Sequence, residues 1–362
     1  MHLGKSFANM GTAGDRIRAA LKSTFVKIVD LAIEEKADLV ILAGDTFDNI
    51  DVSHNFLDFF VSQIGRLGDA PVIILPGARD NYQRGSFWDE WGLTRQTQNL
   101  YPLTDTEKPY IELGGLSTTI YGYPILAETK PDARATRLKR FGRSNHHVAV
   151  IYGTLVLNDR QGTIHYPIYP DDIINGGFDY TAFGGNREYQ NLSPAGIAGA
   201  YPGSPEVLSA GSSKSGHVVV IELGTAPTLK AIKVGELEWV KITIPMETVS
   251  DADDLRQKIN EKSGPNVIME VTFKGLALLE SGFDVDYLRK ELAGNFLYLD
   301  IVDRSRVLPE NVSEVKVQEK TILGQYLRVM VDKLKKAEGA NKNDLEESLK
   351  VGYTLLTGKE HW

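Results

Sequence analysis

The pattern of apolar and polar positions predicts a helix, a strand, a helix and a strand along the first part of the chain. Residues 15–35 predict an amphipathic helix, because apolar residues recur there at spacings of three and four. Residues 39–42 and 71–75 are continuous apolar runs, which favour strands buried on both faces of a parallel sheet. Residues 52–64 predict the helix between them. Short turns join these elements, so we expect a right-handed βαβ unit.

The later segments predict a mixed fold in three regions. Residues 111–123 suggest a hairpin or meander, and residues 132–143 suggest a short basic helix. Residues 148–152 and 180–183 are predicted to form buried strands, and residues 217–234 are predicted to form a closing hairpin. Strands and helices then alternate in a small α+β unit, and two amphipathic helices follow. We therefore predict a core at residues 1–237, an α+β domain at 238–306 and a C-terminal helical hairpin at 307–362.

Composition narrows the classes of site that the chain can hold. None of its 362 residues is cysteine, which excludes disulfides and thiolate metal sites. The formal net charge is −8, so binding of nucleic acid would require a local basic patch. No apolar run is long enough to span a bilayer, and we expect a cytoplasmic protein that does not associate with membranes.

Two aspartates follow the first predicted strand. Gly44 ends the apolar run, and Asp45 and Asp48 come directly after it. Open α/β sheets bind their ligands at the carboxyl ends of strands, and carboxylates there can hold hard or borderline metal ions. Capping aspartates in a turn produce the same pattern. These residues alone leave both interpretations open.

Further motifs lie at the ends of the other strands. They read HLGKSF, GDTFD, PGARDN, IYGT, FGGNREYQ and AYPGSPE, at residues 2–7, 44–48, 76–81, 151–154, 183–190 and 200–206. In this order and spacing they resemble the calcineurin-like metallophosphoesterases, and among these the SbcD-type DNA repair exonucleases. The resemblance implies an α/β fold, namely a four-layer phosphoesterase sandwich with a small α+β capping domain and a C-terminal helical segment.

The resemblance also implies an activity and partners. Proteins of this type hydrolyse DNA phosphodiesters with two Mn²⁺ ions. The capping domain contacts DNA, the core forms a homodimer, and the C-terminal helices bind an SbcC-type ABC ATPase. We take DNA, such an ATPase and a second copy of the chain as the expected partners.

Most of the metal ligands that the resemblance implies are absent from this chain. His2 and Asp45 match ligand positions, while the first Asp of the family would precede Met1. The substituted ligand positions are Ala78, Arg79, Tyr152, Gly185 and Arg187. Alanine and glycine side chains have no ligand atom, and arginine is a cation that repels a metal ion. We therefore predict no metal, no cofactor and no catalytic residue, with Arg79 at the general-acid position of the family.

Two clusters of basic residues have alternative interpretations. Arg79 and Arg187 are predicted to form ion pairs with Asp45 in place of the metals, because buried carboxylates need compensating charge. Paired arginines also bind phosphate, which is the alternative. The second cluster supplies candidates for contact with nucleic acid: Arg134, Arg137, Lys139, Arg140 and Arg143. A charge run is more often a solvated face.

Three functions are compatible with these residues and motifs. The first is a catalytically inactive SbcD-like subunit that binds DNA and the ATPase. The second is an active Mn²⁺-dependent DNA exonuclease or endonuclease with a remodelled site. The third is a phosphoesterase fold that serves another ligand or a regulatory role.

Overall fold

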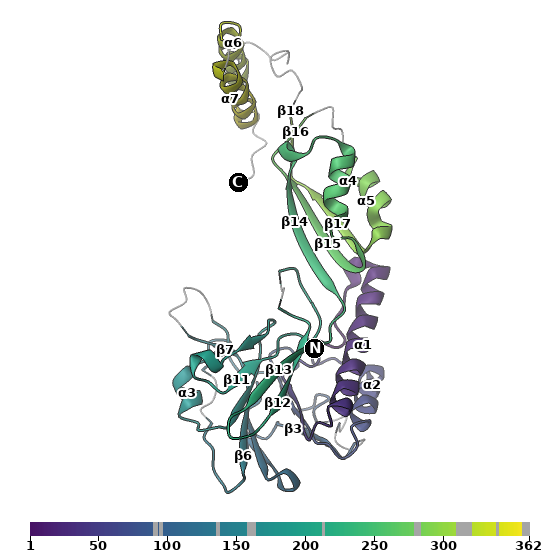
Figure 1. Cartoon of the computed structure of the whole chain (residues 1–362), viewed down its shortest axis with the longest axis vertical. Helices are drawn as coiled ribbons and strands as arrows, with labels where there is room; N and C mark the ends of the chain where they lie inside the picture. The colour runs from purple at the N-terminus through teal and green to yellow at the C-terminus, as the bar shows by residue number, and fades with distance from the viewer. Residues whose placement is uncertain are drawn as a thin grey trace. The chain divides into compact units, whose positions relative to one another are not determined.

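The computed structural model describes residues 1–89, 93, 97–134, 138–157, 164–211, 214–278, 284–308, 321–337 and 340–356. The chain divides into two compact units, Met1–Glu238 and Trp239–Trp362 (Figure 1). The first predicted region ends next to this boundary, and the second unit contains both later regions. Each unit is described by itself.

Unit 1 begins with the βαβ unit that the sequence predicts. Strands β1 (Val40–Ala43), β2 (Val72–Leu75) and β3 (Leu100–Pro102) pair in parallel. Helices α1 (Thr12–Glu34) and α2 (His54–Gly65) pack together through stacked aromatic rings of Phe25 and Phe60. Strand β2 is fully buried, but β1 is half-buried along its whole length. Within the part of the sheet that the structure describes, β1 is an edge strand, so its burial is less complete than the continuous apolar run predicts.

A second, larger sheet packs against the first. Its strand order in the described residues is β10-β11-β9-β6-β5-β4. The bounds are β4 (Tyr110–Leu113), β5 (Thr118–Gly122), β6 (His146–Tyr152), β9 (Tyr180–Gly184), β10 (Gln190–Asn191) and β11 (Gly199–Tyr201). The inner strands are parallel, and the two edge strands are antiparallel to their neighbours.

Alternate residues of β6 serve two cores. Val148 and Val150 lie in one hydrophobic cluster with Ile73 of β2, whereas Ala149 and Ile151 lie in another cluster. This alternation is expected of a strand whose two faces are both covered. The fold of unit 1 is thus mixed α/β with two packed sheets, and the finer four-layer arrangement stays a prediction.

Shorter elements complete unit 1. They are β7 (Thr154–Leu155), β8 (Pro167–Ile168), α3 (Pro170–Ile174) and the hairpin of β12 (His217–Glu222) and β13 (Thr228–Lys233). The predicted closing hairpin is confirmed. The predicted basic helix is wrong, because the described residues 132–134 and 138–143 form turns and irregular backbone. The Arg140 N–H donates to the Gly176 carbonyl (3.0 Å), so this backbone bonds to another segment rather than along a helix.

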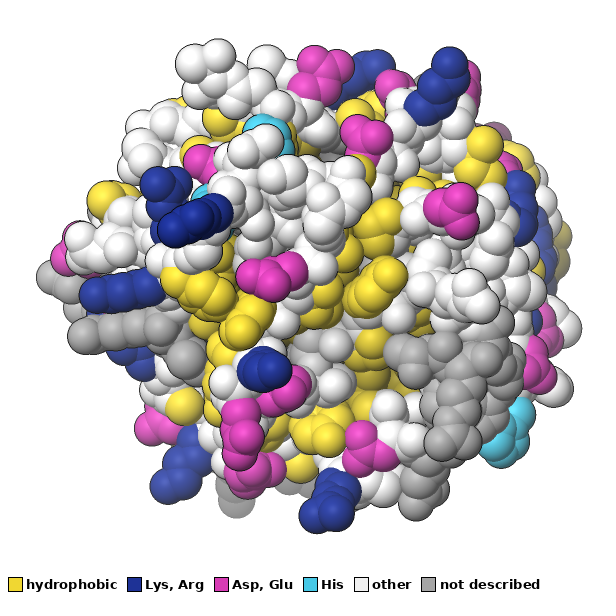
Figure 2. Space-filling view, turned by 90° about the horizontal axis from the view of Figure 1, so that it is seen from below, with side chains coloured by type: hydrophobic (Ala, Val, Ile, Leu, Met, Phe, Trp, Pro, Cys, Tyr) yellow, Lys and Arg dark blue, Asp and Glu magenta, His cyan; other side chains and the backbone are white. Residues whose placement is uncertain are grey.

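Some apolar side chains of unit 1 reach the surface. Ile33, Phe141 and Ile174 are all exposed. Figure 2 shows hydrophobic side chains gathered across one face of the molecule, with acidic and basic side chains around them. Contiguous apolar surface of this kind is typical of interaction sites. The expected homodimer stays a prediction.

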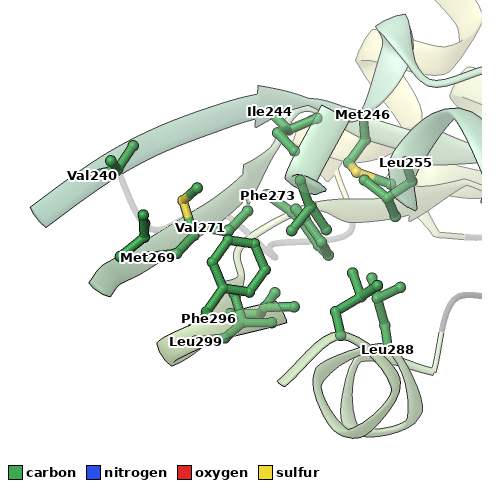
Figure 3. Close-up of a cluster of buried hydrophobic side chains, with 14 residues drawn as sticks. Val240, Ile244, Met246, Leu255, Met269, Val271, Phe273, Leu288, Phe296 and Leu299 are labelled. Atoms are coloured by element: carbon green, nitrogen blue, oxygen red, sulfur yellow. The ribbon is translucent and has the colours of Figure 1, made fainter. Parts of the chain in front are cut away.

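Unit 2 contains a three-stranded sheet with a helical layer. Strands β14 (Glu238–Pro245), β15 (Gly264–Lys274) and β17 (Phe296–Asp303) form this sheet in the described residues. Helices α4 (Ala252–Asn260) and α5 (Val285–Leu292) place Leu255 and Leu288 against Val271 and Phe273 of β15 (Figure 3). Short strands β16 (Leu276–Leu278) and β18 (Arg306–Leu308) pair in parallel.

Two helices end the described chain. Helices α6 (Ile322–Leu334) and α7 (Ala340–Leu356) pack together around Leu327, Met330 and Leu349. This confirms the predicted helical pair. Ile322 is 76% exposed and Val329 is 51% exposed, so part of the apolar surface faces away from the partner helix. None of the helices in the described ranges is both long and apolar enough to cross a membrane.

Candidate functional site

A buried carboxylate joins the loops that follow β1 and β2. Asp80 accepts hydrogen bonds from the backbone N–H groups of Gly77 (2.8 Å), Asp45 (3.0 Å) and Phe47 (3.0 Å). Its side chain is fully buried, and this burial raises the pKa of Asp80 to about 6, with a further contribution from the charge of Asp45. Asp80 therefore acts as a positioning residue that fixes the backbone around Asp45.

Both carboxylate oxygens of Asp45 are already bonded. Oδ1 accepts a hydrogen bond from the Arg79 backbone N–H (2.8 Å), and Oδ2 accepts one from the Tyr152 hydroxyl (2.7 Å). Burial raises the pKa of Tyr152 and the charge of Asp45 raises it further, so the phenol stays a donor. Asp45 has a positive φ of 51°, a conformation that aspartate tolerates and that recurs at functional sites.

His2 lies beside this carboxylate. Its Nδ1 is 3.1 Å from Asp48 Oδ1, and its Nε2 is 3.9 Å from Asp45 Oδ2. Burial lowers the pKa of His2 to about 2, and the N-terminus lowers it further together with three nearby cations, Lys5, Arg79 and Arg187. The imidazole is therefore neutral at pH 7. With Nδ1 donating to Asp48, the Nε2 lone pair faces Asp45.

The predicted ion pairs between Asp45 and the two arginines are wrong. In the described part of the chain, the basic side chain within 4 Å of the Asp45 carboxylate is the neutral imidazole of His2, and Arg79 reaches Asp45 through its backbone. The Arg187 guanidinium instead donates to the Ser209 hydroxyl (3.2 Å). The physical reason is that a neutral phenol and a peptide N–H already satisfy the carboxylate, so no guanidinium is needed there.

Close packing limits which side chains fit at two of the substituted positions, Gly185 and Ala78. Gly185 has a φ of +95°, and a Cβ added to it would lie 3.1 Å from the backbone nitrogen and oxygen of Gly153. A histidine there would require the loop to move. Ala78 packs against the cluster that contains Tyr152, whose ring lies 2.8 Å from the position of a Cβ added to the neighbouring Gly77. The loops have thus closed around small residues and a phenol.

The metal-ligand atoms at this site can hold one metal ion and cannot hold a bridged pair of metal ions. His2 Nε2 and Asp45 Oδ2 are the two protein atoms that could share an ion, and Tyr152 already competes for the oxygen. Across the described ranges, no group of three or more histidine or acidic side chains is arranged to hold a metal. Two-metal hydrolysis requires ions about 3.5–4 Å apart with bridging ligands.

The basic cluster is only partly available for binding. Arg134 donates twice to Asp172 (2.8 Å each) and lies over the Tyr169 ring, and Arg140 is 3.8 Å from Asp179. These two arginines therefore have structural partners. Two more of the predicted candidates, Lys139 and Arg143, are exposed. Arg137 lies outside the described residues.

Sequence reasoning missed the role of Glu206. This carboxylate is fully buried and accepts hydrogen bonds from the Thr24 hydroxyl (2.7 Å) and from three backbone N–H groups, those of Val207, Glu236 and Leu237. It thereby holds the end of unit 1 against helix α1. The only signal in the sequence is its place in the AYPGSPE motif.

Comparisons with known proteins agree with the predicted family. Residues 15–176 match the profile of the calcineurin-like phosphoesterases. An uncharacterized metallophosphoesterase of Bacillus subtilis, YhaO, is 25% identical over 295 residues, covering 76% of this chain and 70% of the relative. These matches support the calcineurin-like metallophosphoesterase family.

Two archaeal DNA double-strand break repair proteins, both named Mre11, are also similar. The protein of Sulfurisphaera tokodaii is 23% identical over 351 residues, covering 93% of this chain and 80% of the relative. That of Saccharolobus solfataricus is 31% identical over 102 residues, covering 28% of this chain and 26% of the relative. The similarity to Mre11 is therefore distant.

The family match corrects the prediction that the chain uses no cofactor. Calcineurin-like metallophosphoesterases normally use metal ions, and both the matched profile and the Bacillus relative are of this class. The prediction of no cofactor is therefore wrong in this respect. The residues that could hold a metal ion are His2 and Asp45, with Asp48 orienting the imidazole.

Proposed function

We propose that this chain, a calcineurin-like metallophosphoesterase homologue, is an SbcD-like subunit that binds DNA and an ATPase partner and does not cleave DNA through a bridged metal pair. The proposal includes the four-layer sandwich for unit 1 and the capping role for the α+β part of unit 2. It is supported by the distant similarity to Mre11 and by the hydrogen bonds that the Asp45 carboxylate accepts.

The observation that carries the proposal is that each oxygen of Asp45 already accepts a hydrogen bond that would compete with a metal ion. A carboxylate that bridges two metal ions needs its lone pairs for them. Here one oxygen accepts from Tyr152 and the other from the Arg79 backbone. A single metal ion, when bound, supplies Lewis acidity. Arg79, at the general-acid position of the family, cannot supply a proton there, because a guanidinium is a permanent cation.

DNA binding would come from local positive charge, because the chain as a whole is acidic. Exposed Lys139 and Arg143 are the remaining candidates of the basic cluster. Removing one phosphate-binding cation should reduce the dependence of the affinity on salt by about one unit of slope. Lys139→Gln and Arg143→Gln should therefore flatten the salt dependence, whereas Lys233→Gln on the exposed strand β13 should leave it unchanged.

The ATPase partner would dock on the helical pair α6–α7. Val329 on α6 and Val351 on α7 are about half exposed, at 51% and 47%. An amphipathic pair with an uncovered apolar face suits a helical partner. Co-expression with a candidate ABC ATPase and size-exclusion chromatography tests this proposal. Val329→Asp should abolish co-elution, and Lys336→Asp at an exposed charged position of the same unit should preserve it.

The decisive experiment measures binding and cleavage of the same labelled DNA duplex in Mn²⁺. We expect salt-sensitive binding with the DNA left intact. Cleavage that requires Mn²⁺ and disappears in Asp45→Asn would establish the alternative, an active nuclease with a remodelled site. Absence of any DNA binding would also contradict the proposal.

A further inference from the structure

Strand β14 borders the three-stranded sheet of unit 2, and its outer backbone edge is uncovered within the described residues. The strand order is β14-β15-β17, so β14 has a neighbouring strand on one side in the sheet as described (Figure 1). Apart from that pairing, no hydrogen bond to the main chain of residues 239–244 occurs in the described ranges. Such an edge presents a row of N–H and C=O groups that can pair with another strand.

The strand at the opposite border of this sheet is contacted by a helix. Arg289 of α5 donates from its guanidinium to the backbone carbonyl of Ile301 in β17 (2.6 Å). The same guanidinium pairs with Asp286 on α5 (2.7 Å), which holds it in place. Covering an edge with a neighbouring element is one way in which proteins prevent strand pairing. The edge of β14 has no such cover within the described residues.

A cavity of about 230 Å³ lies along this edge. Residues 242–245 of β14 line it, together with Met269 of β15 and three residues at the end of α4. Successive side chains of a strand point to opposite faces, so a cavity lined by four consecutive residues follows the backbone edge. It is smaller than the about 300–1,000 Å³ of typical small-molecule sites. Its size and position therefore suit a side chain of an added strand.

The cavity has an apolar base and a basic rim. Ile244 and Met269 are buried, whereas Lys262 is exposed. Lys258 also lines the cavity and pairs with Asp254 of its own helix. Lys262 has no carboxylate within ion-pair distance among the described residues. Even with Glu261 among the lining residues, two lysines leave a net positive charge at the rim of an otherwise acidic chain.

We propose that β14 binds an extended segment of a partner protein as an additional strand, with an apolar side chain of that segment in the cavity and an acidic side chain beside Lys262. In strand addition, main-chain hydrogen bonds supply affinity and a cavity for alternate side chains supplies specificity. The basic rim selects an acidic segment over a basic one. This surface belongs to unit 2, and the proposal does not depend on the Asp45 site or on the proposed function.

The experiment uses peptides selected on the full chain from a phage-displayed library of random heptapeptides. One selected peptide is synthesised with a fluorescent label, and fluorescence anisotropy measures its affinity for wild type and Lys262→Glu. Lys290→Glu, the same charge change at an exposed position of α5, is the matched control. The peptide is also synthesised with an N-methyl group at each residue in turn, which removes one N–H donor at a time. Amide exchange of the full chain with and without peptide locates the binding site.

We expect the selected peptides to share an apolar residue close to an acidic one. Lys262→Glu should weaken binding about five- to tenfold, because a repulsion replaces an attraction, and Lys290→Glu should leave it unchanged. N-methylation should abolish binding at every second residue, since alternate N–H groups of an added strand face β14. Residues 239–244 should gain protection from amide exchange.

Three outcomes would overturn the proposal. The first is that the library yields no binding peptide. The second is equal affinity of wild type and Lys262→Glu, or N-methyl effects without the alternation. The third is concentration-dependent self-association of the chain that protects residues 239–244 in the absence of peptide, which would assign the edge to a second copy of the chain.

Discussion

Replacing Tyr152 with phenylalanine tests how the Asp45 site is held together. The substitution removes the hydroxyl that donates to Asp45 Oδ2 at 2.7 Å and leaves the ring in place. A hydrogen bond to a charged acceptor contributes about 1.5–3 kcal/mol, and Asp45 is mostly buried, with a side chain that is 16% exposed. We therefore expect the free energy of unfolding to fall by about 1.5–3 kcal/mol in chelating buffer.

The same substitution should strengthen metal binding. It releases a carboxylate oxygen that lies 3.9 Å from His2 Nε2. If the competing hydrogen bond is worth about 1.5–3 kcal/mol, its removal should raise the affinity for Mn²⁺ by about 10- to 150-fold. Isothermal titration calorimetry measures the affinity, and urea unfolding with and without Mn²⁺ measures the stability.

A second buried tyrosine provides the control for this experiment. The Tyr201 hydroxyl donates to the Gly153 carbonyl and accepts from the Leu155 N–H, with no contact to Asp45. Tyr201→Phe should lower stability without changing the affinity for Mn²⁺. An unchanged affinity for Mn²⁺ in Tyr152→Phe, or an equal rise in Tyr201→Phe, would refute the competition between the phenol and the metal ion.

Three further substitutions test the surroundings of the site and the helical pair. Glu206→Gln places an amide among donors and should lower the free energy of unfolding by about 2–4 kcal/mol in urea titrations, against almost no change for exposed Glu222→Gln. Because burial raises the pKa of Asp80 from 3.8 to about 6, the charged form is disfavoured in the folded state. The stability of wild type relative to Asp80→Asn should therefore decrease as pH rises from about 4 to 6, by up to about 1.4 kcal/mol per pH unit; a flat difference would show that the carboxyl ionises normally. Leu327→Ala should lower the free energy of protection against amide exchange in α6 and α7 by about 2–5 kcal/mol. Equal protection in Leu327→Ala and in exposed Val329→Ala would contradict the packing of the two helices.

The arrangement of helices and strands could be predicted from the sequence because its periodicity is strong. Helix α1 and the fully buried strand β2 show the expected spacing of apolar residues. Strand β1 has an equally apolar sequence but is an edge strand in the described sheet. Apolar character reports a preference for burial, and it does not report whether a neighbouring strand is present.

The conformation of the basic cluster was harder to predict, because it depends on contacts with residues that are distant along the chain. Arginine and lysine at residues 134–143 suggested a helix, yet Arg134 is held by Asp172 and the backbone of Arg140 by Gly176. Both partners are more than thirty residues away along the chain. Local propensity could not supply this information.

The sequence predicted which residues lie together at the candidate site, but it did not predict which contacts they make with one another. The motifs brought His2, Asp45, Arg79 and Tyr152 to the same place, as the hydrogen bonds and ion pairs of Asp45 show. Because their charges are opposite, we then expected the arginine side chains to form ion pairs with Asp45. A backbone N–H and a phenol satisfied it instead, and hydrogen bonds of this kind cannot be read from residue charge. The role of Glu206 was missed for the same reason.

The number of metal ions bound per chain tests the central claim most directly. Native mass spectrometry of the full chain titrated with Mn²⁺ measures it, and Asp45→Asn serves as the control for binding at this site. We predict at most one ion, which Asp45→Asn removes. Two ions bound together, both lost in Asp45→Asn, would contradict this claim.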